Sequence, residues 1–227
     1  MAFGEKKSLG AQQLGSGRLA VHVWLAKPEE YIKIFNGKTE DPPFVKNSLL
    51  KEFEHWNLQL LKLIEMADGA IVPRNLYMLP VVHKWVHRDG ITLLGDAAHL
   101  MAPFSGEGVN LAMCDSMKLA RAIQNAALAV SSGSIESQSS SRQVLGREIE
   151  KFEKEMFARA TKFQQITWKT TRIIFFESGG MEKNIEKFVI SLVEDGIHRV
   201  LLPVFYAAVY VYFWVWRRWN GVDVGKG

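Results

Sequence analysis

The stretch Ile91–Asn110 constrains this 227-residue chain more than any other segment. The segment Ile91–Leu94, three apolar residues and the β-branched Thr92, follows the turn signal Arg88-Asp89-Gly90 and predicts a short buried strand. We expect that strand to end at Gly95 and Asp96. A carboxylate placed where a strand ends can accept hydrogen bonds from ribose or ribityl hydroxyls of a ligand lying across the edge of the sheet. Asp96 is therefore a candidate ligand-binding residue.

A helix is predicted to begin near Gly106, because small and apolar residues recur at helical spacing after it. These residues are Val109, Ala112, Met113, Ser116, Met117, Ala120 and Ile123. Gly106 and Gly108 have no side chains, so unpaired backbone N–H groups and the positive end of the helix dipole can approach an electron-rich group closely. This arrangement suits the pyrimidine edge of a flavin, which gains negative charge on reduction.

The residues Gly95-Asp96-Ala97-Ala98-His99, followed by Pro103–Asn110, resemble the second FAD-binding motif of single-component FAD-dependent monooxygenases of the aromatic-hydroxylase type. Tetracycline-inactivating monooxygenases and fungal enzymes of secondary metabolism belong to this family. The resemblance implies that Asp96 binds the ribityl chain, that Pro103–Gly108 lies against the isoalloxazine, and that Asn110 lies close to its pyrimidine side. The cofactor-binding residues expected from the motif are Gly95, Asp96, Pro103, Gly106, Gly108, Val109 and Asn110. The alternative is a strand-turn-helix in which these residues serve turn geometry alone.

Two other motifs of that family are missing from this sequence. Gly15–Ala20 has the spacing of a dinucleotide fingerprint, but the preceding segment is polar and Leu19–Leu25 alternates like a strand, so the required strand-turn-helix context is absent. The Asp-Gly pairs at 68–69 and 89–90 do not match the family's middle motif. The chain thus resembles the C-terminal portion of such an enzyme, over about residues 15 to 165.

The expected fold class is mixed α/β (α+β), with a partial FAD-binding domain, a remnant of the substrate-domain sheet, and C-terminal helices. Strands are predicted over Gly17–Ala26 and Ala70–Pro80, and helices over Lys27–Phe35, Phe44–Met66, Gly108–Val130, Val144–Thr170 and Met181–Val193. The expected segments are a polar N-terminal segment over 1–16, the substrate-domain remnant over 17–88, the FAD-binding part over 89–170 with a Ser-rich loop over 131–141, and a helical tail over 171–227 with an apolar segment over 200–216.

Several further residues invite a functional interpretation. In the resembled family a basic residue lies near the flavin or the domain interface at about the place of Arg74, which is otherwise a surface residue. His83 and His87 have helical spacing, but no third ligand completes a metal site, so no metal is predicted. For His99 a structural hydrogen bond that holds the Asp96 loop is favoured over general acid or base catalysis. No catalytic residue is assigned.

Two residues of the predicted helix after Gly108 are interpreted structurally. Asp115 and Lys118 are expected to form a charge pair that faces solvent or a neighbouring domain. The single cysteine, Cys114, is expected to be a core thiol in a reducing compartment.

Charge and hydropathy bear on partners and location. The net charge of +4 is spread along the chain, which argues against nucleic-acid binding. No cleavable signal peptide is visible in Met1–Gly17. The uncharged run Val200–Trp216 ends in aromatic residues and Arg217-Arg218, which fits either a membrane helix or interfacial anchor, or a packing helix. We expect an intracellular protein that is cytoplasmic or membrane-associated.

Two functions remain open at this point. The resemblance implies a monooxygenase in which NAD(P)H reduces FAD, O2 is activated, and an aromatic or polyketide- or terpenoid-like molecule is hydroxylated, in secondary metabolite biosynthesis. The alternative is a truncated or degenerate paralogue without the glycine-rich half. Such a chain would act as a non-catalytic binding or structural protein, or would need a partner chain that supplies the missing half-domain.

Overall fold

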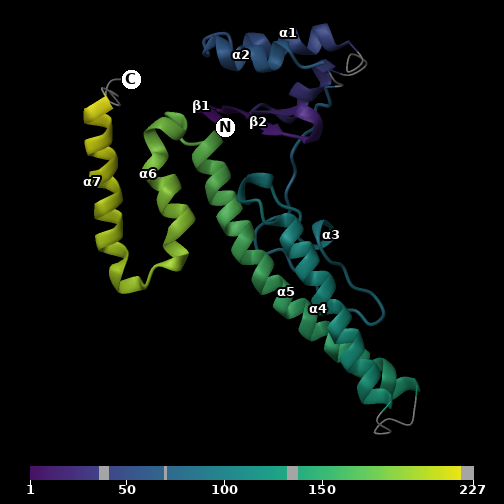
Figure 1. Ribbon diagram of the computed structural model, residues 1–227. Helices are drawn as coiled ribbons and strands as arrows, with labels where there is room; N and C mark the ends of the chain where they lie inside the picture. The colour runs from purple at the N-terminus through teal and green to yellow at the C-terminus, as the bar shows by residue number, and fades with distance from the viewer. Residues whose placement is uncertain (36–40, 69–70, 132–137, 221–227) are drawn as a thin grey trace. The chain divides into compact units, whose positions relative to one another are not determined.

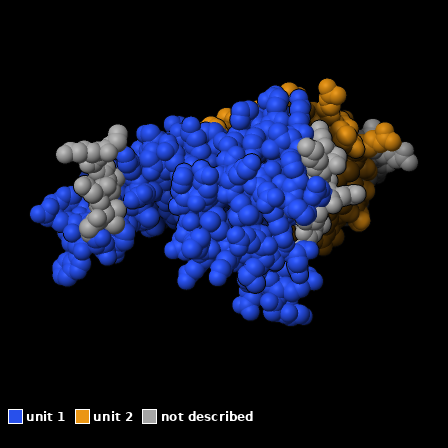
Figure 2. All heavy atoms as spheres, turned by 90° about the horizontal axis from the view of Figure 1, so that it is seen from above, with its two compact units in different colours: residues 1–76, 172–227 blue, residues 77–171 orange. Residues whose placement is uncertain are grey.

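The computed structural model describes residues 1–35, 41–68, 71–131 and 138–220. The chain divides into two compact units, which Figure 2 colours separately. Unit 1 comprises Met1–Leu76 and Arg172–Gly227, and unit 2 comprises Tyr77–Thr171. Helices and a small antiparallel sheet together make a mixed α/β protein, which confirms the predicted fold class. The predicted domain boundaries remain predictions.

Unit 1 begins with a three-stranded antiparallel sheet in the order β1-β2-β3. The strands are β1 (Ala2–Gly4), β2 (Lys7–Gln13) and β3 (Leu19–Leu25). The strand predicted over Gly17–Ala26 is confirmed as β3. No strand is predicted over β2 from its polar, glycine-containing sequence. It forms because it is the central strand, with hydrogen-bonding partners on both sides and Leu9 buried in the core.

The helix predicted over Phe44–Met66 is in fact two helices, α1 (Pro42–Glu52) and α2 (Leu58–Glu65). The break has a local cause, because the Asn57 side chain accepts a hydrogen bond from the Gln59 N–H at 2.8 Å and starts α2. Phe53 fills the break and is fully buried, in a core cluster with Leu9 and Ile64. The helix predicted over Lys27–Phe35 is a 3-10 helix over Glu29–Phe35.

Unit 2 is built on two long helices that lie side by side, as Figure 1 shows in teal and green. They are α4 (Gly108–Ala129) and α5 (Gln138–Phe175), and the short helix α3 (Asp96–His99) precedes them. The core of this unit consists of Ala98, Ala122, Phe152 and Met156. The helices predicted over Gly108–Val130 and Val144–Thr170 are confirmed. The loop predicted over 131–141 is wrong for 138–141, which are helical, and 132–137 lie outside the described residues.

The two strands predicted over Ala70–Pro80 and Ile91–Leu94 are wrong. Ile91–Leu94 contributes only an isolated bridge between Arg88 and Ile91, and the Ile91 side chain is 62% exposed. Within the described residues this segment has no neighbouring strand, and a lone strand cannot satisfy its backbone groups. The described part of Ala70–Pro80, from residue 71, is irregular, and residue 70 lies outside the described residues.

The C-terminal part of unit 1 is a hairpin of α6 (Gly180–Val193) and α7 (Leu202–Asn220), drawn in yellow-green and yellow in Figure 1. The helix predicted over Met181–Val193 is confirmed. An 18-residue window within Arg199–Asn220 has a mean hydropathy of 1.4, and 6% of that window is buried. By length and composition alone this helix could cross a membrane, which is weak evidence when a single helix qualifies.

Candidate functional site

The motif that dominates the sequence forms a loop between Gly95 and the start of α4. Gly95 has φ +60°, which favours glycine, and a Cβ at this position would lie 3.2 Å from the Cβ of Ala112 on α4. Asp96 is the first residue of α3 and is exposed. Among the described residues its carboxylate has no hydrogen bond or ion pair. The loop therefore lies close to α4 and leaves the Asp96 oxygens available to a ligand.

Asp115 on α4 fixes this loop by contacts to Gly95 and His99. Its carboxylate is buried and accepts a hydrogen bond from the Gly95 N–H at 3.3 Å. It also meets His99 Nε2 at 2.6 Å and Arg159 Nη2 at 3.2 Å. The predicted structural hydrogen bond of His99 is thereby confirmed. The predicted exposed pair of Asp115 and Lys118 is wrong, because Asp115 points into the unit and Lys118 pairs with Glu155.

The electrostatics of Asp115 follow from these contacts. Burial raises the pKa of its carboxyl group, but hydrogen bonds from His99, Arg159 and the Gly95 N–H lower it, and the net pKa is below the ordinary value. Asp115 is therefore ionised at neutral pH. Because an ionised carboxylate only accepts hydrogen bonds, the His99 Nε2 atom carries the proton of the pair.

The start of α4 is open. Gly106 has φ +71°, and a Cβ at Gly106 or Gly108 would meet nothing within 4 Å. No side chain caps the helix at Glu107, so the N–H groups of the first turn lack an intrahelical acceptor and a side-chain acceptor. The Gly106 N–H is already donated to the Pro103 carbonyl at 3.0 Å. The donors that remain for a ligand thus belong to α4 itself, beginning at Gly108.

Two side chains at this end of α4 have defined surroundings. Val109 is 73% exposed. The Asn110 side chain donates a hydrogen bond to Glu107 Oε2 at 3.1 Å, so it is oriented by the residue that precedes the helix. Both residues lie in the first turn, beside the free N–H groups.

The turn before α4 is fixed by α5. Pro103–Ser105 forms a single 3-10 turn with Pro103 exposed. The hydroxyl of Thr167, a fully buried residue of α5, donates to Ser105 Oγ at 2.5 Å and lies 3.8 Å from the Met101 sulfur. The loop therefore has one anchor on α4, at Asp115, and one on α5, at Thr167.

The structure brings seven of the eight predicted site residues into one unit. Gly95 packs on Ala112, one helical turn or about 6 Å along the axis from Gly108, so Asp96 lies near the open end of α4. Arg74 is exposed and belongs to unit 1, and its role at the site remains a prediction.

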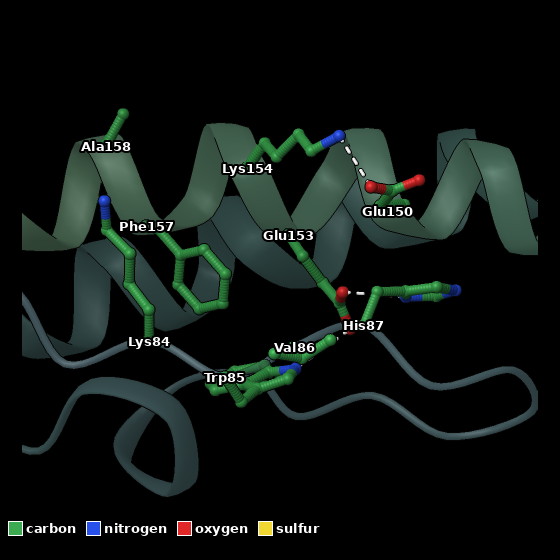
Figure 3. Close-up of a pocket in the computed structure, with 9 residues that line it drawn as sticks. All are labelled: Lys84, Trp85, Val86, His87, Glu150, Glu153, Lys154, Phe157 and Ala158. Atoms are coloured by element: carbon green, nitrogen blue, oxygen red, sulfur yellow. Dashed lines mark hydrogen bonds and ion pairs between the residues drawn. The ribbon is translucent and has the colours of Figure 1, made fainter.

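A second polar cluster in unit 2 surrounds Glu153 of α5 (Figure 3). Glu153 is 1% exposed and accepts hydrogen bonds from Trp85 Nε1 at 3.2 Å and Thr92 Oγ1 at 2.7 Å, while His87 Nδ1 lies 2.8 Å from its other oxygen. Trp85 also packs edge-to-face on Phe157, with ring centres 4.6 Å apart. The cluster joins the segment before the motif to α5.

A recess of about 460 Å³ opens beside this cluster. Its lining comes from two segments and consists of Lys84, Trp85, Val86, His87, Glu150, Glu153, Lys154, Phe157 and Ala158. Burial lowers the pKa of His87, but the hydrogen bond and charge of Glu153 and the nearby Asp89 raise it, and the net pKa is above the ordinary value. Trp85 Nε1 and His87 Nδ1 pair with Glu153, and Lys154 pairs with Glu150, which is typical of a structural cluster, while His87 Nε2 is buried without a hydrogen-bond partner.

The other candidates are placed as follows. Among the described residues no three His, Cys, Asp or Glu side chains are grouped so as to hold a metal ion. Cys114 on α4 is a free thiol of intermediate exposure, so the core position expected for it is wrong. Cys114 precedes Asp115, which belongs to the buried face of α4, so the thiol lies at the border of that face.

Sequence reasoning missed the residues that hold the loop, although the helical spacing contains a signal for them. Asp115 falls on the same face of α4 as the buried Leu111, Ala122 and Ala126. On α5, Glu153 and Thr167 share the buried face with Met156 and Ala160. A polar residue in phase with a buried apolar stripe indicates a satisfied buried group.

Comparison with known proteins gives consistent matches. Residues 76–153 match the family described as FAD binding domain. The chain is 32% identical over 164 residues to the monooxygenase asqM of Emericella nidulans, covering 67% of this chain and 36% of that protein. It is 36% identical over 114 residues to the monooxygenase penA of Penicillium thymicola, covering 50% and 25%. It is 31% identical over 125 residues to the chloroplastic zeaxanthin epoxidase of Nicotiana plumbaginifolia, covering 55% and 18%. The chain thus spans about a third or less of the length of these relatives.

Proposed function

We propose that this chain, which carries part of the FAD-binding domain of an FAD-dependent monooxygenase, holds the flavin and ribityl end of FAD in an enzyme that hydroxylates a small organic molecule. The observation that supports this most directly is the open, uncapped start of α4 beside the unpartnered carboxylate of Asp96. Gly95, the residue before Asp96, packs on Ala112 of the same helix.

The residues present fit a flavin. The N–H groups at the start of α4 and the positive end of its dipole would stabilise negative charge on the pyrimidine side. The missing side chains of Gly106 and Gly108 leave space for a flat ring to approach the backbone. Asp96 would accept hydrogen bonds from ribityl hydroxyls, and Asn110 would lie at the pyrimidine edge. Pro103 is exposed on the turn before the helix and would lie against the ring.

Bound FAD, reduced by NAD(P)H, would supply the chemistry by activating O2 for transfer of one oxygen atom to an aromatic or polyketide- or terpenoid-like substrate. The share of this chain is to bind and orient. Asp115 and Thr167 hold the two ends of the loop, so that the backbone donors do not have to reorganise on binding. No side chain of this chain is proposed as an acid or base. A role in fungal secondary metabolism rests on the printed names and sources of the relatives.

A complete site requires the rest of an FAD-binding domain, in the same polypeptide or in a separate chain. Apolar side chains on the outer side of α4 support this. Val109, Met113 and Met117 are 73%, 62% and 61% exposed. Exposed apolar side chains in a row are typical of an interaction surface. We propose that the diphosphate-binding half packs on this side of α4. Of the two forms of the alternative function, this favours the one in which a second half-domain completes the enzyme.

Flavin fluorescence quenching tests the proposal on the chain as it is. Lumiflavin, riboflavin, FMN and FAD should bind with rising or equal affinity, and ADP should not compete, because the proposed contacts involve the ring and ribityl chain alone. Asp96→Ala should weaken riboflavin binding about tenfold, the effect of losing hydrogen bonds to a charged acceptor, and should leave lumiflavin binding unchanged. Asp68→Asn, at an exposed carboxylate of unit 1, is the matched control.

Addition of the portion of the asqM monooxygenase that this chain does not match, as a separate polypeptide, tests the full activity. A bound flavin absorption band and NAD(P)H-dependent O2 uptake are expected in the mixture. If ADP competed with FAD for the chain as strongly as riboflavin does, the proposal that this chain binds the flavin and ribityl end of FAD would be contradicted. A colourless mixture without O2 uptake would reject the enzyme and leave the non-catalytic paralogue.

A further inference from the structure

Helix α7 is the most apolar exposed element among the described residues. No charged residue occurs from Val200 to Trp216, and Val209 is the buried residue of α7. A soluble helix with so little burial normally carries a charged outer face. The outer face of α7 therefore requires an occupant.

The polar anchors of α7 all point to α6. The Tyr206 hydroxyl donates to Glu194 Oε2 at 3.0 Å, just after the end of α6. At the other end, Arg217 forms a two-pronged ion pair with Glu186, which is 5% exposed, and also donates to the Glu182 carbonyl at 3.2 Å. Val209, between these anchors, is the buried residue of the helix. The spacing of 206, 209, 213 and 217 makes this one face.

The opposite face consists of aliphatic and aromatic side chains, with the exposed Arg218 at its C-terminal end. The exposed ones include Val204 (69%), Val211 (60%), Tyr212 (62%), Trp214 (65%), Val215 (46%) and Trp219 (86%). Tyrosine and tryptophan prefer the interface between lipid headgroups and hydrocarbon, because their rings are apolar and their O–H or N–H groups need a polar partner. In α7 exposed rings of these types occur from Tyr210 to Trp219, through the whole second half of the helix, and not in two belts at its ends.

We propose that α7 lies in the plane of a membrane, with its outer face in the interfacial region of a phospholipid bilayer and α6 on its water side. Figure 1 shows α6 alongside α7 over most of its length. The exposed surface of α6 carries the charged side chains of Glu182, Lys183 and Lys187. The two helices together therefore form one amphipathic body, with the apolar face on α7 and the charged face on α6.

The same contacts argue against a spanning helix. The 19 residues of α7 cover about 28 Å, slightly less than a hydrocarbon core of about 30 Å. Spanning would either carry the charged side chains of α6 into the bilayer or break the Arg217 and Glu186 ion pair, and both are costly. An in-plane position keeps both ion-pair partners in place. It needs only the outer face of α7 to enter the lipid.

Flotation with phosphatidylcholine vesicles tests the proposal on the full chain. The wild-type chain should float with the vesicles, and the bound fraction should persist at high salt, because burial of apolar and aromatic surface drives the binding. Val211→Glu and Val215→Glu place a charge on the outer face and should each reduce the bound fraction at least tenfold. Leu58→Glu is the matched control, since Leu58 is 75% exposed on α2 in the same unit and should not affect flotation.

Peptide tags at the two termini test the orientation. When the chain is added to sealed vesicles, an external protease should remove both tags, because the in-plane helix leaves both ends on the same side. Protection of the C-terminal tag would overturn the proposal in favour of a spanning helix. Absence of wild-type flotation would overturn it in favour of a protein partner or a second copy of this chain. Gel filtration separates these two: if the wild-type chain self-associates and Val211→Glu changes its elution volume, the outer face binds a second copy. Normal flotation of a folded Val211→Glu chain would also overturn it.

Discussion

His99 Nε2 and Asp115 Oδ2 meet at 2.6 Å inside unit 2, with 3% and 1% of their side chains exposed. The pair joins α3 to α4, and the same carboxylate oxygen accepts the Gly95 N–H. A buried hydrogen-bonded pair of this kind connects the stability of the helices to the position of the loop that we propose as the flavin site.

Replacement of Asp115 by Asn should destabilise unit 2. The change leaves His99 and Arg159 without their charged partner, and removal of one member of a buried pair costs about 3–5 kcal/mol. Hydrogen exchange of α4 and α5 amides in urea measures the free energy of opening. Lys118→Gln is the control, because its exposed pair with Glu155 contributes below about 1 kcal/mol. Equal losses in the two variants would contradict the role given to Asp115.

The contribution of Asp115 should depend on pH in a defined direction. Its pKa is lowered in the folded state, so its contribution to stability is complete above the ordinary carboxyl pKa and is lost as the pH falls through the lower, folded value. The stability difference between wild type and Asp115→Asn should therefore be constant near neutral pH and shrink on acidification. Exchange measurements from about pH 7 to about pH 3 give this difference. A difference that grows towards acid would have the wrong sign.

The cluster around Glu153 predicts the opposite dependence for His87. Because the pKa of His87 is raised, its pairing with Glu153 contributes stability below the ordinary imidazole pKa, and this contribution is lost as the pH rises through the raised value. Glu153→Gln should lower the pKa of His87, measured by NMR titration of its ring protons. Glu155→Gln, at an exposed glutamate of the same helix, should leave that titration unchanged.

Two glycines of the loop should respond differently to alanine. Gly95→Ala forces a side chain into φ +60° against Ala112 and should cost about 1–3 kcal/mol, seen as a lower thermal midpoint. Gly108→Ala meets open space in a helix and should keep the midpoint within the shift expected for about 1 kcal/mol. It should still weaken flavin binding, because its methyl group occupies the space before the first N–H groups. An equal fall in both midpoints would show that Gly95 is not specifically required.

Helices were predictable where an apolar stripe has one period over many residues, as in α4, α5 and α6. The break between α1 and α2 was not, because the apolar stripe continues through it and the start of α2 is set by Asn57 as its N-cap. The strand predicted at Ile91–Leu94 failed for a different reason. Strand formation depends on a neighbour that a local pattern cannot reveal, whereas the unpromising sequence of β2 pairs on both sides.

In the candidate site, too, local patterns were predictable from the sequence and tertiary contacts were not. The motif pointed to the residues that we propose face a ligand, such as Asp96 and Gly108, since their types and spacing are those of a flavin-binding turn. It did not identify Asp115, Arg159 or Thr167: Asp115 and Thr167 bind residues 20 and 62 positions earlier in the chain, and Arg159 binds Asp115. Their roles depend on which faces of two helices meet, which is a tertiary property.

The position of α5 determines where an expression clone of unit 2 alone can end. Unit 2 ends at Thr171, but the helix continues to Phe175 in unit 1, so the boundary falls inside one run of backbone hydrogen bonds. A fragment cut at that boundary would end in an artificial helix terminus four residues after Thr167, the residue that anchors the Ser105 turn. Fraying of that terminus would loosen the flavin loop in the fragment. An expression clone of unit 2 should therefore run through Phe175.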